Sequence, residues 1–200
     1  MTYIFTPISD FFWNRFRKIK ISKIELNLKV EPDIKFAEII GAFVTKKEYA
    51  PGDKVKVYIK LKPFRKRIET RIIEIKLPSA LKEGTYMLFV SDAFTRQLVD
   101  SYLSPAKYKP YTFEQLINLY NKMEKSTDLS VWGFKPSYGI TLNGEILDSL
   151  PSSYVSIFKN SVSTGALPAF FQIESKIPTN YVLTGSKTII IQIKKNNFKE

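Results

Sequence analysis

The sequence contains neither cysteine nor histidine. Without cysteine the chain has no disulfide, no thiolate metal site and no cysteine nucleophile, and the redox compartment is left open. Without histidine it lacks the usual general base at neutral pH and the commonest metal ligand. A Ser-His-Asp triad, a histidine-ligated zinc and a two-histidine iron site are therefore excluded. The sequence predicts a protein that is not an enzyme and that has no metal and no cofactor.

Long apolar runs are also missing. No stretch approaches the ~20 apolar residues of a transmembrane helix, so no transmembrane segment is predicted. At the N-terminus an aromatic cluster, residues 11–13, precedes the basic residues, which reverses the order of a signal peptide, and no small-residue cleavage site follows. We expect a cytoplasmic protein if Met1 is the natural start, and a cell-envelope protein if the chain is part of a larger secreted one.

Basic residues outnumber acidic ones by 31 to 19, which gives a formal net charge of +12. This surplus favours contact with an anionic surface, such as nucleic acid, a wall polymer, a membrane or an acidic partner chain. Lysines that only solvate exposed strand faces are the ordinary alternative.

Alternation of apolar and polar residues predicts several strands. It is clearest in residues 54–62, where valine, isoleucine and leucine alternate with lysine or tyrosine. The preceding Pro51 and Gly52 fit a type II turn, because proline presets φ and glycine supplies a positive φ. Further strands are expected at 24–30, 36–47, 68–77 and 85–90. Gly41, inside the second of these, indicates a bulge or a point of close approach.

The second half of the chain mixes helices and strands. A T-x-x-Q capping box at 112–115 predicts a helix over 113–125. Asn143-Gly144 is typical of a two-residue hairpin turn, here between 140–142 and 145–147. Helices are also expected at 93–102 and, opened by Pro151, at 151–158. The remaining predicted strands are 129–134, 170–174 and 187–193.

These elements predict a mainly β chain with some α, in the α+β class. We expect an immunoglobulin-like antiparallel β-sandwich with two or three short helices and a second small β region. The predicted parts are an N-terminal arm (1–20), the sandwich (21–92), and a region (93–200) of helices, a hairpin and C-terminal strands packed on the same core. In the arm, Pro7 and Asp10 are expected to break any early helix. Its aromatic cluster is expected to pack on the rest of the protein or on a missing upstream domain, with an amphipathic membrane anchor as the alternative.

The candidate binding residues follow the strand at 54–62 and the turn after it. Lysines on one face of a strand recur every ~6.6 Å, and Tyr58 and Phe64 are interleaved with them. Such a stripe can follow the phosphates or carboxylates of an anionic polymer. Protection of an edge strand by lysine is the structural alternative. The predicted polyanion-binding residues are Lys54, Lys56, Lys60, Lys62, Arg65, Lys66 and Arg67.

Catalytic patterns are weak. A glycosidase or aspartic-protease site needs two carboxylates held together, and no spacing pairs any two of the scattered acids. A Ser-Lys dyad stays chemically open, but there is no G-x-S-x-G elbow and no serine and lysine are singled out. Residues 185–188, G-S-K-T, lack the upstream glycine of a phosphate-binding loop. The scattered acids are Asp92, Asp100, Asp128, Glu145 and Asp148.

Several short segments follow one another in a distinctive order. They are 49–55 (Y-A-P-G-D-K-V), 61–65 (L-K-P-F-R), 82–85 (K-E-G-T), 112–117 (T-F-E-Q-L-I), 150–153 (L-P-S-S) and 177–186 (I-P-T-N-Y-V-L-T-G-S). In this order the chain resembles, over roughly residues 21–193, the C-terminal non-catalytic region of bacterial proteins related to SpoIVB-type serine peptidases.

In that family the peptidase-like domain, with its serine and histidine, lies upstream of the resembling region. The resemblance therefore implies no catalytic residue in this chain. It implies a non-enzymatic accessory module of a cell-envelope protein, for binding or scaffolding, with the upstream peptidase-like domain or a protein as partner. The alternative is a cytoplasmic nucleic-acid or polyanion binder that uses the basic strand face.

Overall fold

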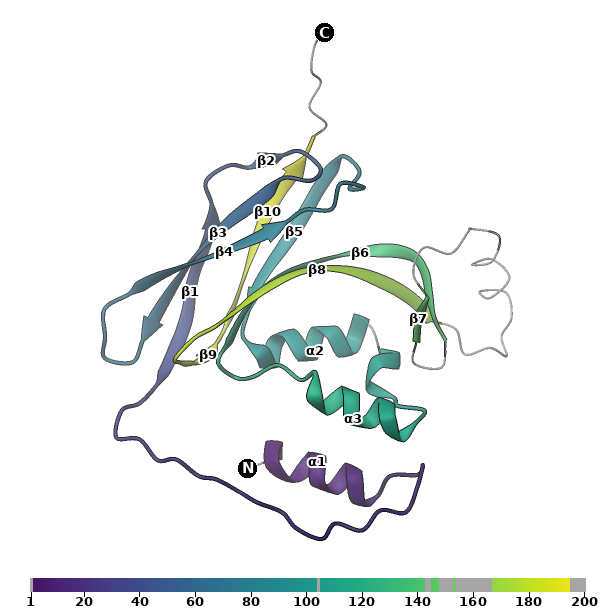
Figure 1. Ribbon diagram of the computed structural model, residues 1–200. Coiled ribbons are helices and arrows are strands. Elements are labelled where there is room, and N and C mark those ends of the chain that lie inside the picture. The colour runs from purple at the N-terminus through teal and green to yellow at the C-terminus, as the bar shows by residue number, and fades with distance from the viewer. Residues whose placement is uncertain (1, 104, 143–144, 148–152, 154–166, 195–200) are drawn as a thin grey trace. The chain divides into compact units, whose positions relative to one another are not determined.

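The computed structural model describes the chain apart from residues 1, 104, 143–144, 148–152, 154–166 and 195–200 (Figure 1). The helices are α1 (Thr2–Phe12), α2 (Ala93–Leu103) and α3 (Phe113–Asn121), with a 3-10 turn, η1 (Pro105–Tyr108). The strands are β1 (Phe36–Val44), β2 (Glu48–Tyr49), β3 (Lys54–Pro63), β4 (Glu69–Lys76), β5 (Gly84–Ser91), β6 (Asp128–Leu142), β7 (Glu145–Leu147), β8 (Leu167–Pro178), β9 (Val182–Thr184) and β10 (Ser186–Ile193). The protein is therefore a β-rich member of the mixed α+β class, as predicted.

The strands form two sheets. The first sheet has the order β4-β3-β1-β9, and the second has the order β2-β10-β5-β6-β7, with β8 also paired to β6. The pairs β1–β9 and β2–β10 are parallel, whereas β3 pairs antiparallel with both of its neighbours. The two-sheet arrangement is thus established, and the immunoglobulin-like topology stays a prediction.

One hydrophobic core lies between the two sheets. On β3, Val55, Val57, Ile59 and Leu61 are fully buried, and they belong to the same apolar cluster as Ile191 on β10. Burying one aliphatic side chain of this size contributes about 1.5–3 kcal/mol. The residues between them on β3 consequently face solvent, because successive side chains of a strand point to opposite faces.

The turn before β3 forms as predicted. Gly52 has a positive φ of 89°, which only glycine adopts without strain. The backbone N–H of Asp53 donates to the carbonyl of Ala50 at 3.1 Å, and the Asp53 carboxylate accepts from the Ala50 N–H at 2.9 Å. On β1, the pairing register with β3 shifts between Ile39 and Gly41, so the predicted bulge is confirmed.

Two compact units divide the chain. The first unit contains Met1–Asp33, Ser104–Met123 and Tyr138–Ala169, and the second contains Ile34–Leu103, Glu124–Ser137 and Phe170–Glu200. The whole first sheet and helix α2 belong to the second unit. Helices α1 and α3 belong to the first unit.

The strand predicted at 24–30 is wrong. This segment is irregular, and the apolar side chains of Ile24, Leu26, Leu28 and Val30 are 57–94% exposed. A strand is stabilised by a hydrogen-bonded neighbour, and no strand pair in the described part of the chain includes this segment. Alternation alone therefore did not suffice to form a strand.

The arm also differs from the prediction, because Pro7 and Asp10 both lie inside α1 instead of preventing it. Proline removes one backbone donor from a helix and crowds the preceding turn. Tertiary packing offsets this cost: the Phe11 ring lies 5.9 Å from that of Phe113 and 5.6 Å from that of Tyr120, and the Tyr120 hydroxyl donates to the carboxylate of Asp10. The prediction that the aromatic cluster packs on the protein is thus confirmed for Phe11.

The remaining boundaries follow from local signals. Thr112 caps α3 by accepting the Gln115 N–H at 3.1 Å, although the helix ends at Asn121 and not near 125. The predicted strands 129–134 and 140–142 are parts of one long strand, β6, which pairs with β7 as the predicted hairpin. The turn at 143–144 and nearly all of the predicted helix at 151–158 lie outside the described residues.

Within the described part, no helix has the length and apolar character needed to span a membrane.

Candidate functional site

The predicted lysine stripe lies on the solvent face of the first sheet. Lys54, Lys56, Lys60 and Lys62 are all exposed on β3, opposite the buried aliphatic positions. However, β3 pairs with β1 on one side and with β4 on the other. The edge-strand explanation of these lysines is therefore wrong, because they lie in the interior of a sheet. We call this solvent face of β1, β3 and β4 the basic face.

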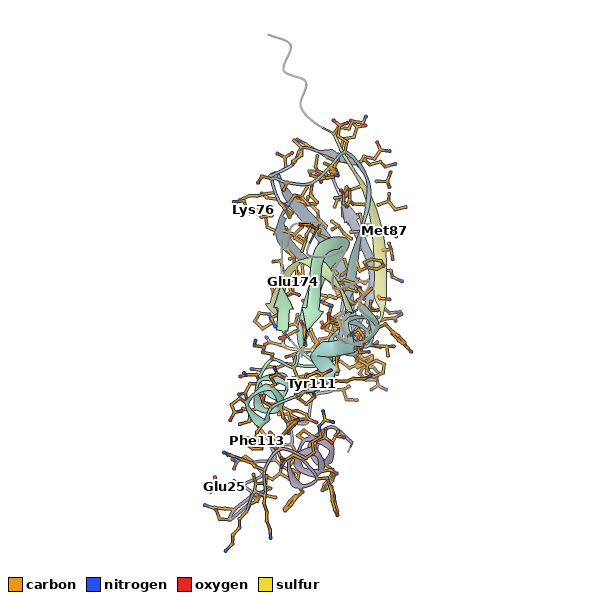
Figure 2. The ribbon with its side chains drawn as sticks, turned by 90° about the vertical axis from the view of Figure 1, so that its right-hand side faces the viewer. Glu25, Lys76, Met87, Tyr111, Phe113 and Glu174 are labelled. Atoms are coloured by element: carbon orange, nitrogen blue, oxygen red, sulfur yellow. The ribbon has the colours of Figure 1, made fainter. Side chains whose placement is uncertain are left out.

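Neighbouring strands add charges of both signs to the basic face. Lys76 lies directly opposite Lys54 on β4, and Glu74 lies opposite Lys56. Lys54 Nζ and Glu74 Oε1 are 2.8 Å apart, and this hydrogen bond raises the pKa of Lys54 and lowers the pKa of Glu74. In Figure 2 the side chains of Lys76 and Met87 lie on opposite sides of the sheets, as their exposure on the first and second sheet requires.

An aromatic pair occupies the centre of the basic face. The rings of Phe43 on β1 and Tyr58 on β3 stack with centroids 5.3 Å apart and planes 13° apart. Ile72, which is 53% exposed, lies opposite Tyr58 on β4. Lys60 Nζ approaches to 5.8 Å from the centre of the Phe43 ring. Two lysines, Lys56 and Lys60, therefore flank an open apolar strip that crosses three strands.

The basic turn continues this face beyond the end of β3. Arg65, in the left-handed region with φ of 54°, holds its guanidinium 5.1 Å from the Phe64 ring. Lys66 Nζ lies 6.0 Å from the centre of the Tyr181 ring. Arg65, Lys66 and Arg67 are all exposed. The structure thus brings the seven predicted residues onto one hairpin, β3 and its turn.

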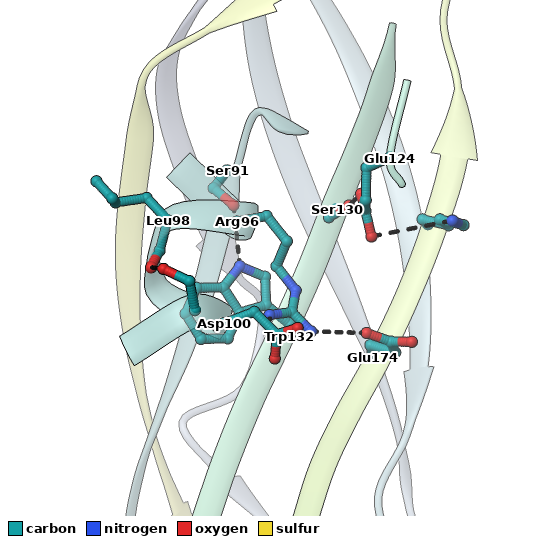
Figure 3. Close-up of polar contacts among 10 residues, drawn as sticks. Ser91, Arg96, Leu98, Asp100, Glu124, Ser130, Trp132 and Glu174 are labelled. Atoms are coloured by element: carbon teal, nitrogen blue, oxygen red, sulfur yellow. Dashed lines mark hydrogen bonds and ion pairs between the residues drawn. The ribbon is translucent and has the colours of Figure 1, made fainter. Parts of the chain in front are cut away.

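A second polar cluster, not predicted from the sequence, surrounds Arg96 on α2 (Figure 3). The Arg96 side chain is only 4% exposed; its Nη2 lies 2.8 Å from Glu174 Oε2 and its Nη1 lies 3.7 Å from Asp100 Oδ1. Its guanidinium stacks over the ring of Trp132 at 4.6 Å, and the indole N–H donates to the hydroxyl of Ser91 at 2.9 Å. These contacts join α2 to β5, β6 and β8.

Asp92 fixes the start of α2. One carboxylate oxygen accepts the N–H of Thr95 at 2.7 Å, as a helix N-cap does, and the other accepts the N–H of Gly185 at 2.6 Å. Gly185 has a φ of 98° in the turn between β9 and β10. Asp92 therefore has a structural role: it connects the helix to that turn.

Some of the scattered acids lie near a second carboxylate, but a basic side chain lies between the two carboxylates of each pair. Asp100 meets Glu174 through Arg96, and Asp128 meets Glu124 through Lys176, whose Nζ lies 4.0 and 3.9 Å from their carboxylates. Each pair shares a cation, which is the arrangement of a structural ion-pair network. Asp148 lies outside the described residues, and only the backbone of Glu145, on β7, is described. Among the described residues no acidic cluster could hold a metal ion.

Two described serines, Ser91 and Ser130, are hydrogen-bonded to groups other than lysine. Ser130 donates to Glu124 Oε2 at 2.8 Å, and Ser91 accepts from Trp132. Neither of these hydrogen bonds involves a lysine amine.

Comparisons with known proteins found no matching family model, no similar curated protein and no similar solved structure. The fold and the site thus define a β-rich α+β protein with two sheets, one of which presents a basic face with an aromatic centre.

Proposed function

We propose that the chain is a non-enzymatic binding module that holds an anionic polymer on the basic face. The observation that carries this proposal is the cross-strand register, which places Lys56 and Lys60 on either side of the stacked rings of Phe43 and Tyr58. A polymer with regularly spaced phosphates gains from the lysines by releasing counterions. Its sugars or bases gain from the exposed rings, because aromatic side chains are general stacking surfaces.

The charge pattern favours a polymer over a small anion. Exposed lysines extend along β3 from Lys54 to Lys62, and exposed basic residues continue into the turn. A small anion is better held by a few converging donors in a pocket, whereas a linear polymer can contact an extended row. Glu74 on the same face, bonded to Lys54, reduces the charge available there.

The resemblance supports a cellular context for this activity. We propose an accessory binding or scaffolding module of a cell-envelope protein related to SpoIVB-type serine peptidases, with an immunoglobulin-like β-sandwich and an upstream peptidase-like domain as partner. The serial order of the resembling segments supports this assignment. A cytoplasmic nucleic-acid binder that uses the same face is the second candidate, favoured by the aromatic stack.

Binding is tested with a fluorescein-labelled single-stranded oligonucleotide and with labelled polyphosphate, by anisotropy over a range of salt concentrations. Lys56→Glu with Lys60→Glu should lower the affinity at least about tenfold and reduce the salt slope by about 1.4, because each phosphate contact on a single strand contributes about 0.7. The matched control, Lys82→Glu with Lys187→Glu, changes the net charge equally at exposed positions outside the basic face. Equal losses in both double variants would reduce the effect to net charge and refute the proposed site.

The cellular context has its own test, an immunoblot of fractionated source cells with antibody against this chain. A larger, envelope-associated band supports the accessory-module assignment. A soluble band at 23 kDa, the mass of this chain, overturns that assignment and favours the cytoplasmic candidate.

A further inference from the structure

Helix α1 has two apolar sides, and only one of them packs within the first unit. Phe11 contacts Phe113 and Tyr120 on α3, as described above. Phe5 and Phe12, seven residues apart and therefore on one stripe of the helix, are 62% and 53% exposed. Trp13, directly after the helix, is 85% exposed. Three large aromatic side chains on or directly after α1 are thus exposed to solvent.

A purely basic segment follows these aromatic residues. Between Phe11 and Ser22 the sequence has no acidic residue, and it contains four cations, Arg15, Arg17, Lys18 and Lys20. Arg15 Nη2 donates to the carbonyl of Pro110 at 3.3 Å, and Arg17 lies 4.1 Å from the ring centre of Phe113.

These two contacts hold the start of the basic segment near the helices of the first unit. Lys18 and Lys20 are exposed. The exposed aromatic residues of α1 and Trp13 are therefore followed directly in sequence by exposed positive charge.

We propose that the first unit docks on an anionic phospholipid surface through Phe5, Phe12 and Trp13, with Lys18 and Lys20 at the headgroups. Helices that lie in the membrane interface combine an exposed apolar side containing Phe or Trp with Lys and Arg, and tryptophan prefers the headgroup level. An acyl layer accepts large rings without a shaped pocket, and negative headgroups match the basic segment. At eleven residues, α1 is too short to span a bilayer.

The docking surface is distinct from the basic face, because the two belong to different units. It also differs in chemistry: the basic face alternates lysines with one stacked pair, whereas α1 presents aromatic residues with no cation within the exposed stripe. Lipid binding is therefore expected to survive substitutions that abolish polymer binding.

The first experiment is co-sedimentation of the full chain with vesicles of phosphatidylglycerol and phosphatidylcholine in equal parts, and with vesicles of phosphatidylcholine alone. We expect binding to the anionic vesicles, a loss of at least about tenfold on vesicles without negative lipid, and a similar loss for Phe12→Ser with Trp13→Ser. The matched control is Met87→Ser with Ile190→Ser, which removes side chains of similar exposure, 52% and 60%, from the second sheet. This control should bind like the parent chain.

Tryptophan fluorescence locates the contact. The chain has two tryptophans, and Trp132 is 1% exposed whereas Trp13 is 85% exposed. Anionic vesicles should shift the emission to shorter wavelength in the parent chain and in Trp132→Phe, and they should leave Trp13→Phe unchanged. Circular dichroism of each variant checks that it is folded.

Three results would overturn the proposal. The parent chain does not sediment with anionic vesicles, it binds neutral vesicles equally well, or the shift in fluorescence emission persists in Trp13→Phe. Loss of vesicle binding in Lys56→Glu with Lys60→Glu would assign the contact to the basic face instead. Vesicle-independent self-association that Phe12→Ser abolishes would make the aromatic side an interface between copies of this chain.

Discussion

The buried guanidinium of Arg96 allows a sharp test of the packing of α2 against the sheets. Arg96→Met keeps an unbranched apolar chain over Trp132 but removes the cation that Asp100 and Glu174 share. Removing one partner of a buried ion pair typically costs about 3–5 kcal/mol, because a charge is left uncompensated. The side chain of Asp100 is 12% exposed and that of Glu174 is 56% exposed, so water can solvate only the latter. We therefore expect a loss of about 3 kcal/mol, mostly from Asp100.

The assay is urea denaturation followed by far-UV circular dichroism and by tryptophan fluorescence, in which the buried Trp132 reports unfolding. With a slope of about 1–3 kcal/mol per molar urea, the midpoint should fall by at least about 1 M. Glu174→Gln is the exposed-partner control, for which we expect a loss below about 1 kcal/mol. Replacing both Arg96 and Asp100 by apolar residues should recover much of the loss, since no buried charge is left. A urea midpoint for Arg96→Met within roughly 0.2 M of that of the parent chain would refute this reasoning. So would a double variant whose midpoint is no higher than that of Arg96→Met.

Three further predictions concern other elements. Leu28→Ser should change stability by less than about 0.5 kcal/mol because Leu28 is 77% exposed, whereas Leu61→Ala, at a fully buried position, should cost about 2–5 kcal/mol in urea denaturation. Gly52→Ala should cost about 1 kcal/mol in the same assay because of its positive φ, and Gly41→Ala, with only ordinary contacts at 3.8 Å, should cost less. Burial and the hydrogen bond to Asp10 raise the pKa of Tyr120, so the unfolded chain ionises first and stability should fall above about pH 10; thermal melts should show a shallower fall for Tyr120→Phe.

The elements that could be predicted from the sequence are those whose signals are local. The turn at Gly52 and the N-cap at Thr112 depend on a few adjacent residues, and both form as expected. Residues 54–62 and 24–30 have equally regular alternation, yet only the first segment is a strand. The difference is the presence of partner strands: β3 pairs with β1 and β4, whereas no strand pair in the described part of the chain includes 24–30. The alternation within one segment does not indicate whether a partner strand pairs with it. Pro7 failed as a breaker for the same reason: the packing of α1 on α3 outweighs a local preference.

The candidate site, like the fold, could be predicted from the sequence only where the signal is local. The lysines of β3 could be found because alternation fixes which side chains share a face. Phe43 and Ile72 could not, since only the cross-strand register places them beside Tyr58. The partner of Arg96, Glu174, is 78 residues away in sequence, and no spacing indicates that contact.

The first unit is discontinuous in sequence, and the chain passes between the two units five times. No contiguous fragment therefore contains α1 and α3 without also containing β1, β3 and β4, so genetic truncation cannot isolate the aromatic side of α1 in its packed form. During synthesis, α1 leaves the ribosome long before Phe113, its packing partner, has been made. Until then its aromatic side chains are not covered by α3. A nearby membrane or chaperone can therefore bind them before the protein has folded.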